Sequence, residues 1–217
     1  MGESAEMKEQ IAELLKGIDR YNPENLPALE SYVETQAIEN TYDLEANLAV
    51  LKLYQFNPTF FQTSVTGQIL LKALMNMPHT DFVLCKALID TVRLEEETLY
   101  PILYIANQLE TCQFREFWTF LEQNPGIIIG ISGFVEAIKK FVCHVINITY
   151  QTIHIDLLTS LLGNISDEEV KEFMRRHGWK RFAGGEIFIA NQEENVKTKN
   201  IKENINFDSV AGIMASS

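Results

Sequence analysis

Residues 165–190 read ISDEEVKEFMRRHGWKRFAGGEIFIA, a helix-start signal followed by two extended runs around a pair of glycines. The first part contains a capping box. In this motif the Ser166 hydroxyl accepts a hydrogen bond from the Glu169 amide, and the Glu169 carboxylate accepts one from the Ser166 amide. The helix is expected to end at His177 and Gly178, because glycine fits the left-handed conformation that follows many helices.

Runs with the composition of β-strands follow this helix. Residues 179–182 and 186–190 flank a Gly-Gly pair, and this arrangement predicts a β-hairpin. Earlier in the chain, residues 134–148 and 155–162 carry apolar side chains at helical spacing. Three helices followed by a β-hairpin is the order of a winged helix, in which the third helix often reads DNA.

The chain before this module is predicted to be helical throughout. Apolar residues recur at helical spacing as far as residue 123, and the connections between the predicted helices are short. Short connections force neighbouring helices antiparallel, and such pairs stack into superhelical arrays. Two Asn-Pro helix starts, at Asn22 and Asn57, lie 35 residues apart, which is close to the period of helical repeats.

The clearest break in the chain is Asn124-Pro125-Gly126. We therefore predict a mostly α, PCI-like fold in which a HEAT-like or TPR-like helical array precedes a winged helix. The predicted units are the array over residues 1–124, the winged helix over 125–191, and a C-terminal tail with an amphipathic helix over 192–217.

Two local predictions concern helix boundaries within the array. Asn57 is expected to be the N-cap of a helix that runs to Leu74, because a side-chain oxygen at this position can accept from the first amides. A fifth helix is expected to place Phe82, Cys85 and Val92 on one inward face.

Charge and composition exclude several classes of partner. The 217 residues include 30 acidic and 18 basic side chains, a net charge of −12, and most of the excess acid lies before residue 126. An acidic surface repels phosphate, so nucleic acid is a poor candidate for the main partner. No apolar run approaches the roughly 18 residues needed to cross a bilayer, so no membrane partner is expected. With three scattered cysteines and no signal peptide, we expect a cytoplasmic protein with some nuclear presence.

The sequence contains no pattern typical of a catalytic, metal or cofactor site. It has no Gly-rich phosphate loop and no His-Glu-x-x-His, and its four histidines lack metal-ligand spacing. We therefore expect no enzymatic activity, no catalytic residues, no metal and no cofactor. One basic cluster could contact RNA or phosphate weakly, although a solvated helix end with favourably placed basic residues is the simpler explanation; it comprises Arg175, Arg176, Lys180 and Arg181.

Apolar side chains near the C-terminus suggest surfaces that other proteins cover. We predict that the second strand of the hairpin presents an edge to a partner strand through Ile187, Phe188 and Ile189. The tail carries too many apolar residues to lie free in water, so its helix packs either on its own chain or in a partner's bundle; the predicted contacts are Phe207, Val210, Ile213 and Met214.

Four stretches resemble one family of PCI-type scaffold subunits. They are LKGIDRYNPENL at 15–26, YDLEANLAVLKLYQFNP at 42–58, NFDSV at 206–210 and IMASS at 213–217. Together they are similar to the k subunits of eukaryotic translation initiation factor three, and the resemblance covers nearly the whole chain.

The resemblance implies a non-catalytic scaffold in a complex that binds the small ribosomal subunit and helps to load initiator tRNA and mRNA. It implies contacts with other subunits of that complex, especially the l subunit, and contact with the ribosome through the complex. Two alternatives remain open from the residues: a scaffold subunit of another PCI complex, such as the proteasome lid or the signalosome, and an RNA-binding winged-helix module.

Overall fold

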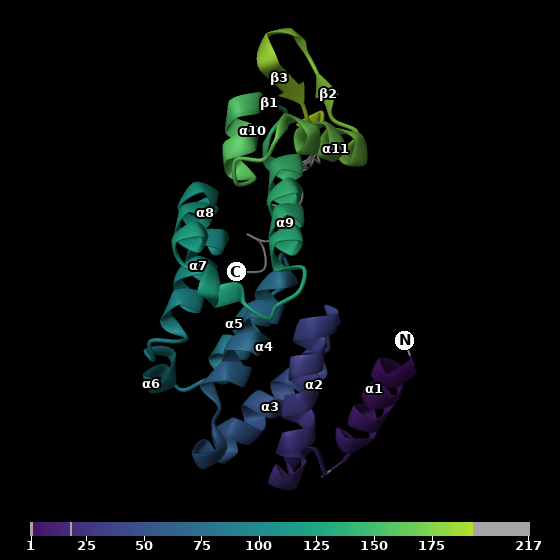
Figure 1. Cartoon of the computed structure of the whole chain (residues 1–217), viewed down its shortest axis with the longest axis vertical. Coiled ribbons are helices and arrows are strands. Elements are labelled where there is room, and N and C mark those ends of the chain that lie inside the picture. Colours follow the sequence, from purple (N-terminus) through teal and green to yellow (C-terminus); the bar gives the residue numbers. More distant parts are fainter. Residues whose placement is uncertain (1, 18, 193–217) are drawn as a thin grey trace, which may run out of the picture.

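The computed structural model describes residues 2–17 and 19–192, and these form a mostly helical, elongated molecule (Figure 1). The predicted mostly α fold is confirmed. Helices of the first half pack on their sequence neighbours, with α4 also contacting α2, α7 and α9. They are α1 (Gly2–Leu14), α2 (Leu26–Glu39), α3 (Leu44–Phe56), α4 (Thr63–Met75), α5 (Asp81–Ala87), α6 (Thr91–Leu94), α7 (Tyr100–Glu110) and α8 (Phe114–Gln123).

The second half combines helices with a small sheet. A short 3-10 helix at Pro125–Ile128 follows α1–α8, which we call the array. Helix α9 then carries the chain away from the array to the far end of the molecule (Figure 1). The elements there are α9 (Phe134–Thr149), β1 (Thr152–His154), α10 (Ile155–Leu161), α11 (Asp167–His177), β2 (Lys180–Arg181) and β3 (Glu186–Phe188). We call this part, from α9 to β3, the C-terminal module.

The sheet corrects one prediction about the hairpin. The hairpin between β2 and β3 is confirmed, but β1 was not predicted and pairs antiparallel with the other side of β3. The strand order is β1-β3-β2, so β3 is the central strand and both of its edges are occupied. Ile187 therefore lies opposite Ile153 and is fully buried, instead of lying at a free edge.

The predicted capping box fixes the start of α11. The Glu169 amide donates to Ser166 Oγ over 3.3 Å, and the Ser166 amide donates to Glu169 Oε2 over 3.0 Å. At the other end, Gly178 has a φ of 73°, the left-handed conformation that glycine adopts without strain. Both ends of this helix follow from the sequence.

Two helix boundaries differ from their predictions. Asn57 does not cap the following helix: its Nδ2 donates to the Leu53 carbonyl over 3.0 Å, so it closes α3, and α4 begins only at Thr63. Val92 does not lie on the inward face of a fifth helix. Asp90 accepts from the Val92 amide over 3.2 Å and starts the separate helix α6, on which Val92 is 72% exposed.

One continuous hydrophobic core crosses the break at residues 124–126 and runs from Ile11 to Ile189. The Trp118 indole of α8 donates to the Leu161 carbonyl over 2.8 Å, at the end of α10. Just before α9, the Ser132 amide donates to the Ala37 carbonyl of α2 over 2.9 Å. Together with the packing of α4 against α9, these two hydrogen bonds attach the C-terminal module to the first eight helices.

We predict that Gly163→Ala lowers the free energy of unfolding by about 1–3 kcal/mol, because Gly163 has a φ of 84° and an added Cβ would lie 2.9 Å from Trp118 Cδ2. The matched control is Gly126→Ala, where no atom lies within 4 Å of an added Cβ; it should change stability by less than about 0.5 kcal/mol. Urea denaturation of the purified chains measures both values. Equal stability of the two variants would contradict this account of the junction.

Candidate interaction surface

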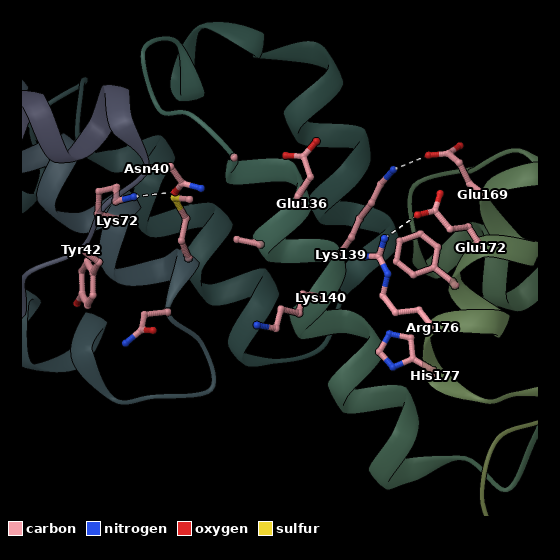
Figure 2. Close-up of a pocket in the computed structure, with 15 residues that line it drawn as sticks. Asn40, Tyr42, Lys72, Glu136, Lys139, Lys140, Glu169, Glu172, Arg176 and His177 are labelled. Atoms are coloured by element: carbon pink, nitrogen blue, oxygen red, sulfur yellow. Dashed lines mark hydrogen bonds and ion pairs between the residues drawn. The ribbon is translucent and has the colours of Figure 1, made fainter. Parts of the chain in front are cut away.

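The described surface contains a groove of about 840 Å³ between the array and the C-terminal module. One wall comes from α4 and from the turn that follows α2, and the other comes from α9 and α11 (Figure 2). Its walls carry both acidic and basic side chains beside the apolar Met75 and Phe173. A groove of this kind suits a polar segment of another protein better than a small apolar ligand.

The array wall contains a buried lysine. Lys72 lies on α4, is 3% exposed, and donates from Nζ to Asn40 Oδ1 over 3.0 Å. Asn40 ends α2 in the left-handed conformation, with a φ of 56°. No carboxylate lies within ion-pair distance of Lys72 in the part of the chain that the structure describes. Burial alone therefore lowers the pKa of Lys72 from its ordinary value.

The opposite wall holds two ion pairs, one between its two helices and one within α11. Lys139 of α9 lies 3.1 Å from Glu169 of α11, and Arg176 lies 2.7 Å from Glu172 on α11 itself (Figure 2). The pKa of Glu169 is lowered chiefly by the hydrogen bond from the Ser166 amide and then by the one from Lys139. The Glu169 carboxylate, which caps α11, thus also links α11 to α9 through Lys139.

Two charged residues of α9 face the groove without such partners. Glu136 and Lys140 both line it and both are exposed. Within residues 2–17 and 19–192, neither makes a hydrogen bond or ion pair with another side chain. They lie one helical turn apart, so the groove presents an acid and a base side by side, both without a partner in the part of the chain that the structure describes.

His177 closes the end of the groove nearest the sheet. Its ring stacks on Trp179 with centroids 5.0 Å apart, and its Nδ1 lies 3.4 Å from Asn147 Nδ2. The Trp179 indole donates to Asn147 Oδ1 over 2.7 Å. Since an amide nitrogen can only donate, His177 Nδ1 accepts and the ring is neutral. Burial, and then the charge of Arg176, lowers the pKa of His177.

The predicted basic cluster does not form one surface. Its four residues are all exposed, but Arg176 turns into the groove and pairs with Glu172. Lys180 lies opposite Phe188 and Arg181 opposite Ile187, so these two neighbours on β2 point to opposite faces of the sheet. Contact of this cluster with RNA stays a prediction, with less geometric support than the sequence suggested.

The predicted partner contacts separate into two groups. Ile187 and Ile189 belong to the core, and Phe188 lies 6.0 Å from Phe182 between ring centroids. Pairing of a partner strand with β3 is therefore a wrong prediction, because β1 and β2 already occupy its edges. The remaining four contacts lie outside the described residues and stay predictions; they are Phe207, Val210, Ile213 and Met214.

Sequence reasoning missed the groove and its buried lysine. The available signal was a charged residue inside the apolar run ILLKALM at 69–75, where a lysine interrupts the inward face of a helix. In the described ranges, no three His, Cys, Asp or Glu side chains gather closely enough to hold a metal ion. The same ranges contain no helix that is both long and apolar enough to cross a membrane.

Comparison with known proteins gives a consistent result. The model of the CSN8/PSMD8/EIF3K family matches residues 61–200. Relatives named eukaryotic translation initiation factor 3 subunit K occur in Xenopus tropicalis and Homo sapiens, each 59% identical over 212 residues that cover 98% of this chain and 97% of the relative. The protein of that name from Nematostella vectensis is 48% identical over 213 residues, with 98% of this chain and 99% of the relative covered.

We predict that the free energy of unfolding falls as the pH drops below 6.5, the ordinary pKa of histidine, until the lower folded-state pKa of His177 is passed. The unfolded chain binds this proton more tightly than the folded chain, so protonation favours unfolding. An NMR titration of the His177 ring, assigned with His177→Gln, measures the pKa directly. A midpoint at or above 6.5 would show that burial does not control this ring.

Proposed function

The chain belongs to the CSN8/PSMD8/EIF3K family, and from this premise we propose that it serves as subunit K of eukaryotic translation initiation factor 3. The observation that carries the proposal is similarity over the full length: relatives with that name are up to 59% identical and align with 98% of this chain. The aligned residues include both the array and the C-terminal module. The similarity is therefore to the whole relative and not to one shared motif.

The proposed role is that of a non-catalytic scaffold. We assign α1–α8 to a HEAT-like array and the C-terminal module to a winged helix. The order of its elements, α9-β1-α10-α11-β2-β3 with a three-stranded antiparallel sheet, supports the second assignment. Surfaces available to partners are the groove and exposed apolar side chains at the array's end, such as Tyr21 and Phe56, whose rings meet edge to face.

The proposed partners are other subunits of the initiation factor, first among them the l subunit. Contact with the small ribosomal subunit is then made through the assembled complex, in the cytoplasm with some presence in the nucleus. A direct role in RNA binding is less favoured, because Lys180 and Arg181 point to opposite faces of the sheet and Arg176 pairs with Glu172.

We predict that a tagged full-length chain, expressed in eukaryotic cells and purified at physiological salt, recovers the other subunits of translation initiation factor 3. Mass spectrometry of the recovered proteins is the measurement, with the tag alone as the control. Recovery of proteasome-lid or signalosome subunits instead would assign the chain to a different complex. Recovery of RNA without these subunits would favour the RNA-binding alternative.

We further predict that the tail contributes to this association through its apolar residues. Changing Phe207→Asp together with Ile213→Asp should reduce recovery of the complex at least about tenfold, because buried carboxylates without partners are costly at an interface. The matched control adds the same two charges at polar positions, Asn204→Asp with Ser209→Asp. Circular dichroism verifies that both variants keep their helices, and equal recovery by both would remove the tail from the interface.

A further inference from the structure

Lys72 and Asn40 together offer two hydrogen-bond donors to an anion. Within residues 2–17 and 19–192, Lys72 Nζ has one acceptor, the neutral Asn40 Oδ1 at 3.0 Å, and its ammonium can donate three hydrogen bonds. Because Asn40 Oδ1 accepts that bond, the orientation of the amide is fixed, and Nδ2 is the atom that can donate to a ligand. Asn40 is exposed and covers the lysine at the wall of the groove (Figure 2).

Burial makes this arrangement costly without a partner. An ammonium taken out of water loses hydration that one neutral acceptor only partly replaces, and a methionine would fill the same space without that loss. A carboxylate placed here would gain charge-assisted hydrogen bonds from Lys72 Nζ and Asn40 Nδ2. Lys72 and Asn40 thus supply the hydrogen-bond donors, and Lys72 the positive charge, that a bound carboxylate needs.

The backbone keeps the Asn40 amide in place. Gly133 begins α9 with a φ of 74°, and an added Cβ there would lie 2.5 Å from Asn40 Nδ2. The absence of a side chain at Gly133 therefore leaves the room that the amide occupies. The adjacent bond from the Ser132 amide to the Ala37 carbonyl holds the two segments together.

The remaining charges of the groove select the kind of anion. Besides Lys72, the groove is lined by three acids, Glu136, Glu169 and Glu172, and three bases, Lys139, Lys140 and Arg176, so these charges give no net attraction for a polyphosphate backbone. A peptide that carries one carboxylate and a neighbouring base fits better, since Glu136 and Lys140 have no partner among the described residues and can pair with a base and with a second acid. Met75 and Phe173 provide apolar contact between these charges.

We propose that the groove binds a mixed-charge segment of another subunit, with an Asp or Glu carboxylate on Lys72 and Asn40 and a basic side chain on Glu136. This inference rests on the proposed function, which supplies the partner proteins. It adds the place of contact and the chemistry of the segment.

Carbodiimide coupling tests the contact directly, because it joins amines and carboxylates only where they touch. In the complex purified with the tagged chain, we expect coupling of Lys72 or Lys140 to an Asp or Glu of another subunit, identified by mass spectrometry. Coupling of these lysines only to Glu193, Glu194 or other acids of the chain's own tail would place the tail in the groove and overturn the proposal. Intact recovery of the complex without either product would also overturn it, while leaving the proposed function unaffected.

Two variants test the energetics of the same contact. Lys72→Met keeps the length and bulk of the stem, and Asn40→Gly keeps the left-handed backbone while it removes the amide. Each should weaken binding of the full chain to factor particles purified without it by about tenfold, as expected for a lost hydrogen bond to a charged group. Lys86→Met is the matched control, since Lys86 is exposed on α5 and does not line the groove.

The two variants also separate loss of contact from loss of fold. Methionine removes a buried charge, so Lys72→Met should keep the parent's urea midpoint. Glycine accepts the φ of 56° at position 40 but takes away the acceptor of Lys72, so Asn40→Gly should unfold at a lower urea concentration. Weakened binding of Lys72→Met with stability retained supports the proposal. Binding equal to that of Lys86→Met in both variants contradicts it.

Discussion

The orientation of the C-terminal module on the helical array depends on the packing of α9 against α4 and on two hydrogen bonds at the junction. The Trp118 indole lies against Gly163 and donates to the Leu161 carbonyl. The Ser132 amide, just before α9, donates to the Ala37 carbonyl of α2. Because the side chains of this continuous core are closely packed, the walls of the groove keep their relative position even though they come from residues about 100 positions apart in the chain.

The helices could be predicted from sequence because their signals are local. The capping box at Ser166 and Glu169 gives the start of α11, and the apolar spacing of Phe114, Phe117 and Trp118 gives the inward face of α8. The errors also have local causes. Asn57 can accept from amides ahead of it or donate to carbonyls behind it, and in the folded chain it donates to Leu53. Asp90 starts a new helix within a run whose apolar spacing continues through it.

The sheet and the groove could not be predicted in the same way, because they depend on residues that are distant in sequence. β1 has three residues and takes its place only by pairing with β3, more than 30 positions later. The charge of Lys72 is evident in the sequence, but its burial and its bond to Asn40 require the packing of α4 against the end of α2. Basic residues that are close in sequence, such as Lys180 and Arg181, were separated by the alternation of side chains along β2.

The position of β3 in the centre of the sheet has a consequence for solubility. The outer strands β1 and β2 have three and two residues, so little unpaired strand backbone is left at either border. Short borders give another chain few places to add a strand and to begin an ordered aggregate. A newly synthesised chain that has not yet bound its partner proteins is therefore protected from self-association through this sheet. This holds even when the chain is made in excess over those partners.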